Sequence, residues 1–211
     1  MMREPAVQTA AAQAGQDPSI AGSSGRHFVR QAGIAIAATA LVALCAHISI
    51  PLGFTPVPIT LQPFAVLLLG LLLAPETSFA ALSLYLVEGA AGLPVFSPHG
   101  PQGIAHLFGF TGGYLLAAPF AAAVAGLIYR DGRKKLLYAV AGAAVGDLIL
   151  LTIGALWLGA WTHASFAVLL NQSVVPFLAS DAAKVVAAAA CAQIFSSFSR
   201  NSSSRHSSQA E

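Results

Sequence analysis

Long apolar segments separated by short polar breaks make up most of this sequence of 211 residues. A helix needs about 20 mainly apolar residues to cross the hydrocarbon core of a bilayer. Six segments reach or approach that length, at residues 28–48, 60–74, 77–92, 111–129, 136–160 and 174–195. Only 9% of the residues are charged, whereas a soluble domain contains about 25%. The sequence therefore predicts an all-α integral membrane protein, a compact bundle of six transmembrane helices over residues 26–195.

The second and third segments are short, and Ala74-Pro75-Glu76-Thr77 separates them. A single kinked helix over both segments would reduce the bundle to five crossings. A proline is unfavourable inside a helix but is accepted at the first turn of a new one. We therefore expect one helix to end before Pro75 and a second to begin there, which gives six crossings.

The positive charges indicate how these helices are oriented. The three predicted outside loops, at about residues 49–59, 93–110 and 161–173, contain no lysine or arginine. Lysine and arginine accumulate in the cytoplasmic loops of membrane proteins. With six crossings, both termini and all nine of the following residues are cytoplasmic: Arg3, Arg26, Arg30, Arg130, Arg133, Lys134, Lys135, Arg200 and Arg205. A chain with five crossings would place the two termini on opposite sides and break this pattern.

The two ends of the chain differ in composition from the apolar segments. Residues 1–25 are rich in alanine, glutamine, serine and glycine and lack the apolar core of a signal peptide. Residues 196–211 are polar and rich in serine. We expect both segments to be disordered tails, because neither contains enough apolar side chains to form a packed structure.

Two of the outside loops are unusually apolar. The first contains three prolines within residues 51–58, and the second combines proline, glycine and large apolar residues over 93–110. A loop that only connects two helices through water is normally more polar and can be shorter. We expect these loops to be ordered and to fold back over a site between the helices, although packing alone would also explain them.

One lysine lies inside an apolar segment. Lys184 follows Asp181 by three residues, so both side chains lie on the same face of the last predicted helix. A charge at bilayer depth costs roughly 2.5–3.5 kcal/mol and therefore faces the interior of a bundle or a cavity. A buried ion pair rarely adds net stability, since both ions lose their hydration. We therefore interpret the pair as part of a site for a polar ligand, with a purely structural ion pair as the alternative.

Other polar groups flank the outside loops and are candidate ligand contacts. Hydroxyls, an amide and backbone N–H groups near helix ends would suit an uncharged ligand that forms hydrogen bonds. Glu88 is a candidate either to contact the ligand or to form an ion pair with Lys184. The other candidates are Thr60, Gln62, Tyr85, Thr111, Gly112, Gly113 and Tyr114.

Several classes of function are disfavoured. The chain has no Walker-type nucleotide motif, no His-Glu-x-x-His and no Gly-x-Ser-x-Gly. The pair Gly146-Asp147 would fit an intramembrane aspartyl protease only if Asp181 were the second acid, and Lys184 next to Asp181 argues against that role. The histidines have no metal-ligand spacing, and a net charge of +2 does not indicate a nucleic-acid partner. We expect neither an enzyme nor a metal site.

The first predicted helix carries small residues at intervals of four. They are Gly33 with Ala37, and Ala35 with Thr39 and Ala43. Small side chains let a second helix approach closely within a membrane. This stripe is a candidate interface with a partner protein, although alanine is abundant enough here for a stripe to occur by chance.

Four blocks of the sequence together resemble the BioY family, the biotin-specific substrate-binding components of energy-coupling factor transporters. The resemblance extends over about residues 30–195 and rests on residues 56–62 (PVPITLQ), 85–96 (YLVEGAAGLPVF), 111–115 (TGGYL) and 176–184 (PFLASDAAK). Phe110 stands where the family often has proline, and residues 97–106 differ from the glycine-rich loop typical of the family. We expect these differences to affect closure of the loops.

The resemblance implies a function and a set of partners. It implies high-affinity binding and uptake of biotin at the cytoplasmic membrane of a bacterium or archaeon, with biotin bound near the outer face. It also implies no cofactor, a transmembrane coupling protein and a pair of ABC-type ATPases. Two alternatives remain open, namely a component of the same fold for another small vitamin and an uncoupled biotin facilitator or secondary transporter.

The chemistry of biotin suggests roles for individual residues. Its ureido ring has two N–H donors and one carbonyl acceptor, and its valerate chain ends in a carboxylate. Asp181 would accept from a ureido N–H, and Lys184 would donate to the ureido oxygen, an assignment that we favour over pairing of Lys184 with the carboxylate. Aromatic groups would cover the apolar ring, and the candidates are Phe54, Phe96 and Tyr114.

Overall fold

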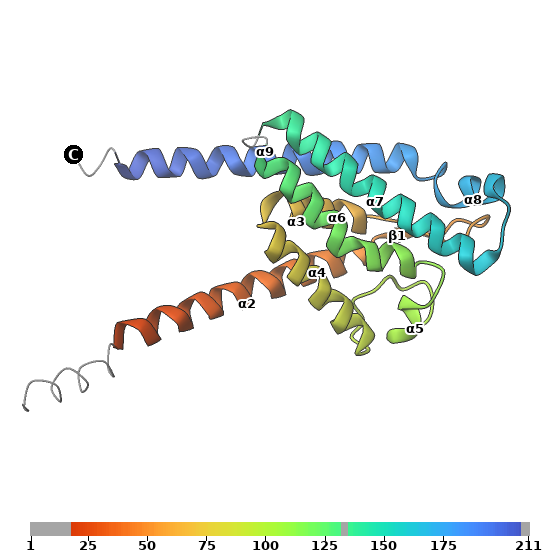
Figure 1. The fold of residues 1–211 in the computed structure, drawn as a ribbon, viewed down its shortest axis with the longest axis horizontal. Helices are drawn as coiled ribbons and strands as arrows, with labels where there is room; N and C mark the ends of the chain where they lie inside the picture. Colours follow the sequence, from red (N-terminus) through yellow and green to blue (C-terminus); the bar gives the residue numbers. More distant parts are fainter. Residues whose placement is uncertain (1–17, 132–134, 208–211) are drawn as a thin grey trace, which may run out of the picture.

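The structure, a computed structural model, describes residues 18–131 and 135–207 and is mainly a bundle of helices (Figure 1). The longer helices are α2 (Pro18–His47), α3 (Gln62–Leu72), α4 (Pro75–Ala90), α6 (Gly112–Asp131), α7 (Leu136–Thr162) and α9 (Leu178–Ser207). The connections contain two short helices and a small hairpin, namely α5 (Ile104–Leu107), α8 (Phe166–Ser173), β1 (Ser49–Ile50) and β2 (Ile59–Thr60). The predicted all-α membrane class is confirmed.

Four of these helices are long and apolar enough to cross a membrane, and they contain Val29–His47, Gly112–Arg130, Leu136–Thr162 and Leu178–Phe198. The other two are shorter, with 11 residues in α3 and 16 in α4. At about 1.5 Å per residue they extend roughly 16 and 24 Å, compared with about 30 Å of hydrocarbon core. Each predicted segment thus contains one helix, whereas six full crossings remain a prediction.

The break between the second and third predicted segments is confirmed. Helix α3 ends at Leu72, and Leu73 and Ala74 both have extended backbone angles before α4 begins at Pro75. Proline suits this position because its missing N–H would have no partner within the first helical turn. A single kinked helix through this region is therefore excluded.

The helices at both ends are longer than the sequence predicted. Helix α2 begins at Pro18 and α9 continues to Ser207, so residues 18–25 and 196–207 are helical where disordered tails were expected. Helix α9 contains neither glycine nor proline, and each further residue of an existing helix adds a hydrogen bond without a new nucleation step. The remaining parts of the two predicted tails, residues 1–17 and 208–211, lie outside the described residues.

Helix α6 is central to the packing and contacts α3, α4 and α7, while α3 and α7 also contact α9. Small residues allow this close approach. A Cβ atom added to Gly142 of α7 would lie 2.6 Å from the carbonyl oxygen of Ala125 in α6, and one added to Gly70 of α3 would collide with the backbone of Ala122. A larger side chain at either glycine would push the helices apart.

The connections gather at two opposite ends of the bundle (Figure 1). The hairpin, α5 and α8 lie at one end, on the right of the view. The α3–α4 connection, the end of α6 and the start of α7 lie towards the other, as do the first turns of α2 and the last turns of α9. An ion pair of 3.8 Å between Arg130 and Glu76 joins α6 to α4 at that end. The connections that were predicted to be outside loops therefore share one end.

Candidate ligand-binding site

A pocket opens at the end of the bundle that carries the hairpin, with about 700 Å³ of empty space including its open mouth. The pocket is lined by Val57, Pro58, Thr60, Gln62, Pro63, Val66, Ser97, His106, Thr111, Tyr114, Leu115, Ala118, Asp147, Leu150, Leu151, Phe177, Asp181 and Lys184. Residues from both apolar loops belong to this wall, as the composition of the loops predicted.

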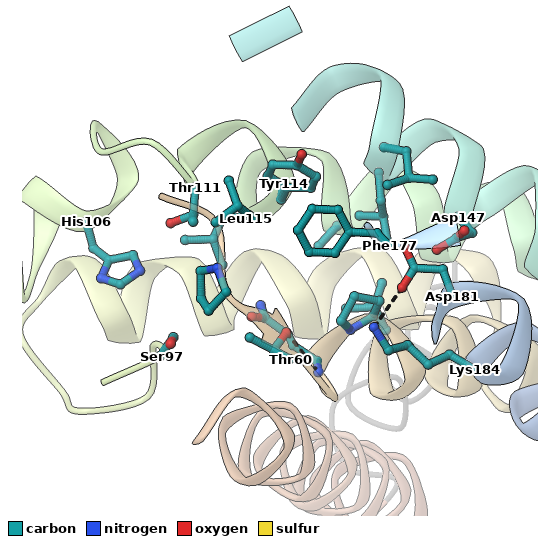
Figure 2. Close-up of a pocket in the computed structure, with 18 residues that line it drawn as sticks. Thr60, Ser97, His106, Thr111, Tyr114, Leu115, Asp147, Phe177, Asp181 and Lys184 are labelled. Carbon is teal, nitrogen blue, oxygen red and sulfur yellow. Dashed lines mark hydrogen bonds and ion pairs between the residues drawn. The ribbon is translucent and has the colours of Figure 1, made fainter. Parts of the chain in front are cut away.

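Asp181 and Lys184 form an ion pair at one end of the pocket (Figure 2), with 2.7 Å between Lys184 Nζ and Asp181 Oδ1. Their side chains are only 5% and 9% exposed. Asp181 lies in the first turn of α9, where the positive end of the helix dipole stabilises a carboxylate. The predicted geometry of the pair is confirmed, and both residues line the pocket.

Asp147 of α7 lies at the same end of the pocket, near the pair (Figure 2). It is 8% exposed, and its Oδ1 atom has no hydrogen-bond partner among the described residues. From the sequence, Asp147 was considered only as a protease acid and was not predicted to line a ligand site. An acid within an apolar helix was the available signal. Among the described residues, no three His, Cys, Asp or Glu side chains lie together as a metal site would require.

The middle of the pocket is apolar. Phe177 precedes α9 and packs with Val57, Leu151 and Leu158. The ring of Tyr114 lines the pocket, and its hydroxyl donates to the carbonyl oxygen of Ser173 at 3.1 Å. Tyr114 therefore offers mainly an apolar ring surface to a ligand, which agrees with its predicted covering role.

Thr60 and Gln62 line the pocket from the hairpin and the start of α3, as predicted. The hydroxyl of Thr60 accepts a hydrogen bond of 3.3 Å from the backbone N–H of Gln62. Its own proton therefore stays available for a second acceptor.

Ser97, His106 and Thr111 surround the opposite end of the pocket (Figure 2). Thr111 precedes the first turn of α6 and was predicted as a ligand contact. Ser97 and His106 belong to the second apolar loop and were not predicted as ligand contacts. Their position depends on how that loop folds back, which no local pattern in the sequence reveals.

Tyr85 and Phe96 were predicted as ligand contacts but do not line the pocket. The hydroxyl of Tyr85 donates to the carbonyl oxygen of Val95 at 2.9 Å, and the two rings meet edge to face with centroids 5.4 Å apart. Both side chains are fully buried. They attach the second loop to α4, because a buried phenol needs a hydrogen-bond partner and finds one in the loop backbone.

Glu88 and Phe54 also lie away from the pocket. Glu88 accepts a hydrogen bond of 3.4 Å from the hydroxyl of Thr39 in α2, since its face of α4 packs on that helix. It is not the partner of Lys184, which pairs with Asp181. Phe54 is 61% exposed and so does not cover the pocket in this structure.

Gly112 and Gly113 serve helix packing. A Cβ atom on Gly112 would collide with the carbonyl oxygen of Leu107, and one on Gly113 would collide with Trp157 of α7. The N–H of Gly112 already donates to the carbonyl oxygen of Gly109 at 3.1 Å. The backbone donor predicted for the ligand at Gly112 is therefore occupied.

The stripe of small residues on α2 is divided between two faces. Gly33 and Ala37 are exposed, and a Cβ atom on Gly33 would meet nothing within 4 Å. Thr39 is buried against α4, and Ala43 packs against the core. Ala35 is half-buried. Only the outward part of the stripe, Gly33 and Ala37, is accessible to another helix.

Comparison with known proteins identifies close relatives. A model of the BioY family matches residues 14–200. The chain is 40% identical over 154 residues to a probable biotin transporter BioY of Pyrococcus horikoshii, covering 73% of this chain and 88% of that protein. It is 38% identical over 151 residues to the biotin transporter BioY2 of Lactococcus lactis, covering 70% of this chain and 79% of that protein.

A solved structure has the same fold. It is described as the S-component for biotin from an ECF-type ABC transporter, and its TM-score to this chain is 0.74 at 23% sequence identity. The match covers 82% of this chain and 93% of that one. The family match extends over nearly the whole described structure, including the pocket and the ion pair at its end. The chain belongs to the BioY family.

Proposed function

We propose that this chain binds biotin and is the substrate-specific component of an energy-coupling factor transporter. The observation that carries the proposal is the buried Asp181–Lys184 pair at one end of a largely apolar pocket. The chain belongs to a family whose members are named biotin transporters. A buried charged pair that opens into a cavity gains little by itself and is well suited to a polar ligand.

The polar groups of biotin match those of the pocket. One carboxylate oxygen of Asp181 accepts from Lys184, and the second would accept from a ureido N–H. Lys184 has further N–H donors, of which one would reach the ureido oxygen. The thiophane ring would lie against Tyr114 and Phe177, which take the place of Phe54 and Phe96 as the covering groups. Thr60 and Gln62 would add hydrogen bonds along the wall.

The chain is a multi-pass protein of the cytoplasmic membrane, since it has four apolar helices of spanning length and belongs to a family of membrane transporters. We propose that α3 and α4 also cross, with both termini in the cytoplasm. The first turns of α2, the last turns of α9, the end of α6 and the start of α7 lie towards one end of the bundle (Figure 1). Arg130 and Lys135 lie at that end, and the pocket would then open towards the outside.

The BioY family consists of transporter components and not of enzymes. We propose that ATP is hydrolysed by separate ABC-type ATPases, because this sequence has no Walker motif. A transmembrane coupling protein would connect them to this chain. Gly33 and Ala37 on the outward face of α2 offer a surface on which its helix can pack closely. No cofactor is required for this role.

Equilibrium binding of labelled biotin to the purified chain in detergent tests the proposal. The wild type is expected to bind tightly, and Asp181→Ala and Lys184→Ala are each expected to weaken binding more than tenfold, about 1.4 kcal/mol. Glu76→Ala is the matched control, because it removes an exposed acid that pairs with Arg130 at the opposite end. Elution as a single symmetrical peak identifies the variants that remain folded.

The alternatives give different results. A folded wild type that binds another vitamin but not biotin would reassign the specificity within the same fold. Biotin uptake by cells that lack every ATPase partner would indicate an uncoupled facilitator. Binding that survives both substitutions would leave Asp181 and Lys184 a structural role only.

A further inference from the structure

The pocket has a second polar end that the proposed function does not use. His106 lies there in α5 with 3% of its surface exposed, and it lines the pocket together with Ser97 and Thr111. Figure 2 shows these three residues at the opposite end from Asp147, Asp181 and Lys184. The apolar middle of the pocket separates the two groups, so the site suits an elongated ligand that is polar at both ends.

The hydrogen bond of the His106 ring determines which nitrogen is left for a ligand. Nδ1 lies 2.7 Å from the carbonyl oxygen of Pro101. A carbonyl oxygen can only accept, so Nδ1 carries a proton and donates it there. Nε2 has no hydrogen bond to any described residue. It is the ring nitrogen available to the pocket.

The ring is held in place by its neighbours. Its centroid lies 5.1 Å from that of Phe96, which packs in turn on Tyr85. Gly100 and Gly103 have φ values of +118° and +69°, and these turns let the loop wrap around the histidine. The position of His106 is thus fixed before a ligand binds, which reduces the entropy lost on binding.

The groups around Nε2 are donors and include no acid that lines this end of the pocket. The Ser97 hydroxyl accepts a hydrogen bond of 3.5 Å from the N–H of His99, so its own proton can be donated. The elements packed here carry further titratable groups. The Tyr85 and Tyr114 hydroxyls donate to backbone carbonyls, and Glu76 pairs with Arg130 at the other end of the bundle. Glu88 of α4 is bonded to Thr39, and His99 of the loop is bonded to Ser49. Neither lines the pocket.

The opposite end differs, because the acids Asp147 and Asp181 line it and Lys184 already pairs with Asp181. A ligand carboxylate placed there would be repelled by the Asp181 carboxylate. At the His106 end a carboxylate would meet the Ser97 and Thr111 hydroxyls and the His106 ring. An imidazolium with a carboxylate adds no net charge to the buried site.

We propose that His106, with the Ser97 and Thr111 hydroxyls, binds the carboxylate of the ligand and so fixes its orientation in the pocket. The proposal rests on the proposed function and assigns the ureido ring to the Asp181–Lys184 end. In the complex the ring is an imidazolium, in which Nδ1 donates to Pro101 and Nε2 donates to a carboxylate oxygen, and the second proton is bound from solvent together with the ligand. Lys184 then does not contact the carboxylate.

Comparison of two ligands with matched variants tests this assignment. Biotin and biotinamide, which lacks the carboxylate charge, are each titrated into the wild type, His106→Asn and Lys184→Ala. Asparagine keeps a side-chain N–H that can donate to the Pro101 carbonyl and removes only the group at Nε2. His99→Asn changes an exposed histidine of the same loop and is the control.

His106→Asn is expected to lower the affinity for biotin at least tenfold and the affinity for biotinamide less than twofold. Lys184→Ala is expected to lower the affinity for both ligands by the same factor. If His106→Asn lowered the affinity for both ligands by the same factor, the histidine would only support the loop, and the proposal would be overturned. Full affinity for biotin in that variant would overturn it as well, while the proposed function would stand. A wild type that binds neither ligand would overturn both.

Discussion

At the scale of single residues, Asp181 and Lys184 show how a buried pair serves a site rather than stability. Both side chains are almost completely buried and share a bond of 2.7 Å. Removal of one partner leaves the other charge without compensation, whereas removal of both takes away the two charges of the pair together. Stability and ligand binding therefore respond differently to single and double substitutions.

We expect Asp181→Leu and Lys184→Met, made singly, each to destabilise the fold by about 3–5 kcal/mol. The double variant is expected to be more stable than either single variant. None of the three is expected to bind biotin. Thermal unfolding in detergent without ligand measures the first effect, and equilibrium binding measures the second. A double variant that unfolds below both single variants would show that the pair itself stabilises the bundle.

Asp147 gives a second prediction at this scale. Its Oδ1 has no hydrogen-bond partner among the described residues, and a buried acceptor without a partner costs about 1–3 kcal/mol. Asp147→Leu is therefore expected to raise the unfolding temperature without ligand and to weaken biotin binding severalfold. Calorimetry and a binding titration on the same preparation check both effects. A lower unfolding temperature with unchanged affinity would contradict this expectation.

Six of the twelve predicted ligand contacts line the pocket, and the packing of the other six explains why they do not. Asp181, Lys184, Thr60, Gln62, Thr111 and Tyr114 lie in its wall, and their contact with a ligand remains a prediction. Tyr85 and Phe96 do not line the pocket. An aromatic ring can pack against a ligand or against a loop of the protein, and these two rings hold the second loop on α4. His106 was missed, since nothing close to it in sequence shows that the loop turns it inwards.

At the scale of elements, the apolar loops contain more structure than their sequence indicates. Residues 49–60 form a small hairpin, and α5 and α8 lie in the second and third loops. Their contacts are with distant segments. The Thr55 hydroxyl donates to the carbonyl oxygen of Gln172 at 2.7 Å, and the Tyr114 hydroxyl reaches Ser173. The predicted lid is therefore held by contacts across the chain rather than by its prolines alone.

Helix α2 gives a prediction at the same scale, because its small residues lie on two faces. Gly33→Leu is expected to leave the fold and biotin binding unchanged, since a side chain there meets nothing within 4 Å. It is expected to block association with a transmembrane coupling protein. Co-purification with that protein and biotin uptake in cells measure the loss.

Thr39→Val is the matched variant on the inward face, where the hydroxyl contacts Glu88. It is expected to affect stability and to leave the association intact. Normal association of Gly33→Leu would show that the coupling protein docks elsewhere.

At the scale of the whole molecule, the orientation in the membrane gives a further prediction. Ser165 and Lys135 are both exposed and precede α8 and α7 respectively. With Cys45 and Cys191 replaced by alanine, Ser165→Cys is expected to react with an impermeant maleimide in intact cells. Lys135→Cys is expected to react only in inverted vesicles. The same accessibility for both cysteines would place Lys135 and Ser165 on one side of the membrane and would mean that α7 does not cross it.

The sequence by itself determined the class of the molecule, its helical segments, the break before Pro75 and the position of the buried charged pair. Each of these follows from local chemistry, since the bilayer selects apolar helices and an i,i+3 spacing places two side chains on one face. Tertiary structure decided which polar groups meet across the pocket. Asp147, His106 and Ser97 come from α7, α5 and a loop, and only the packing of those elements brings them to the two ends of one cavity.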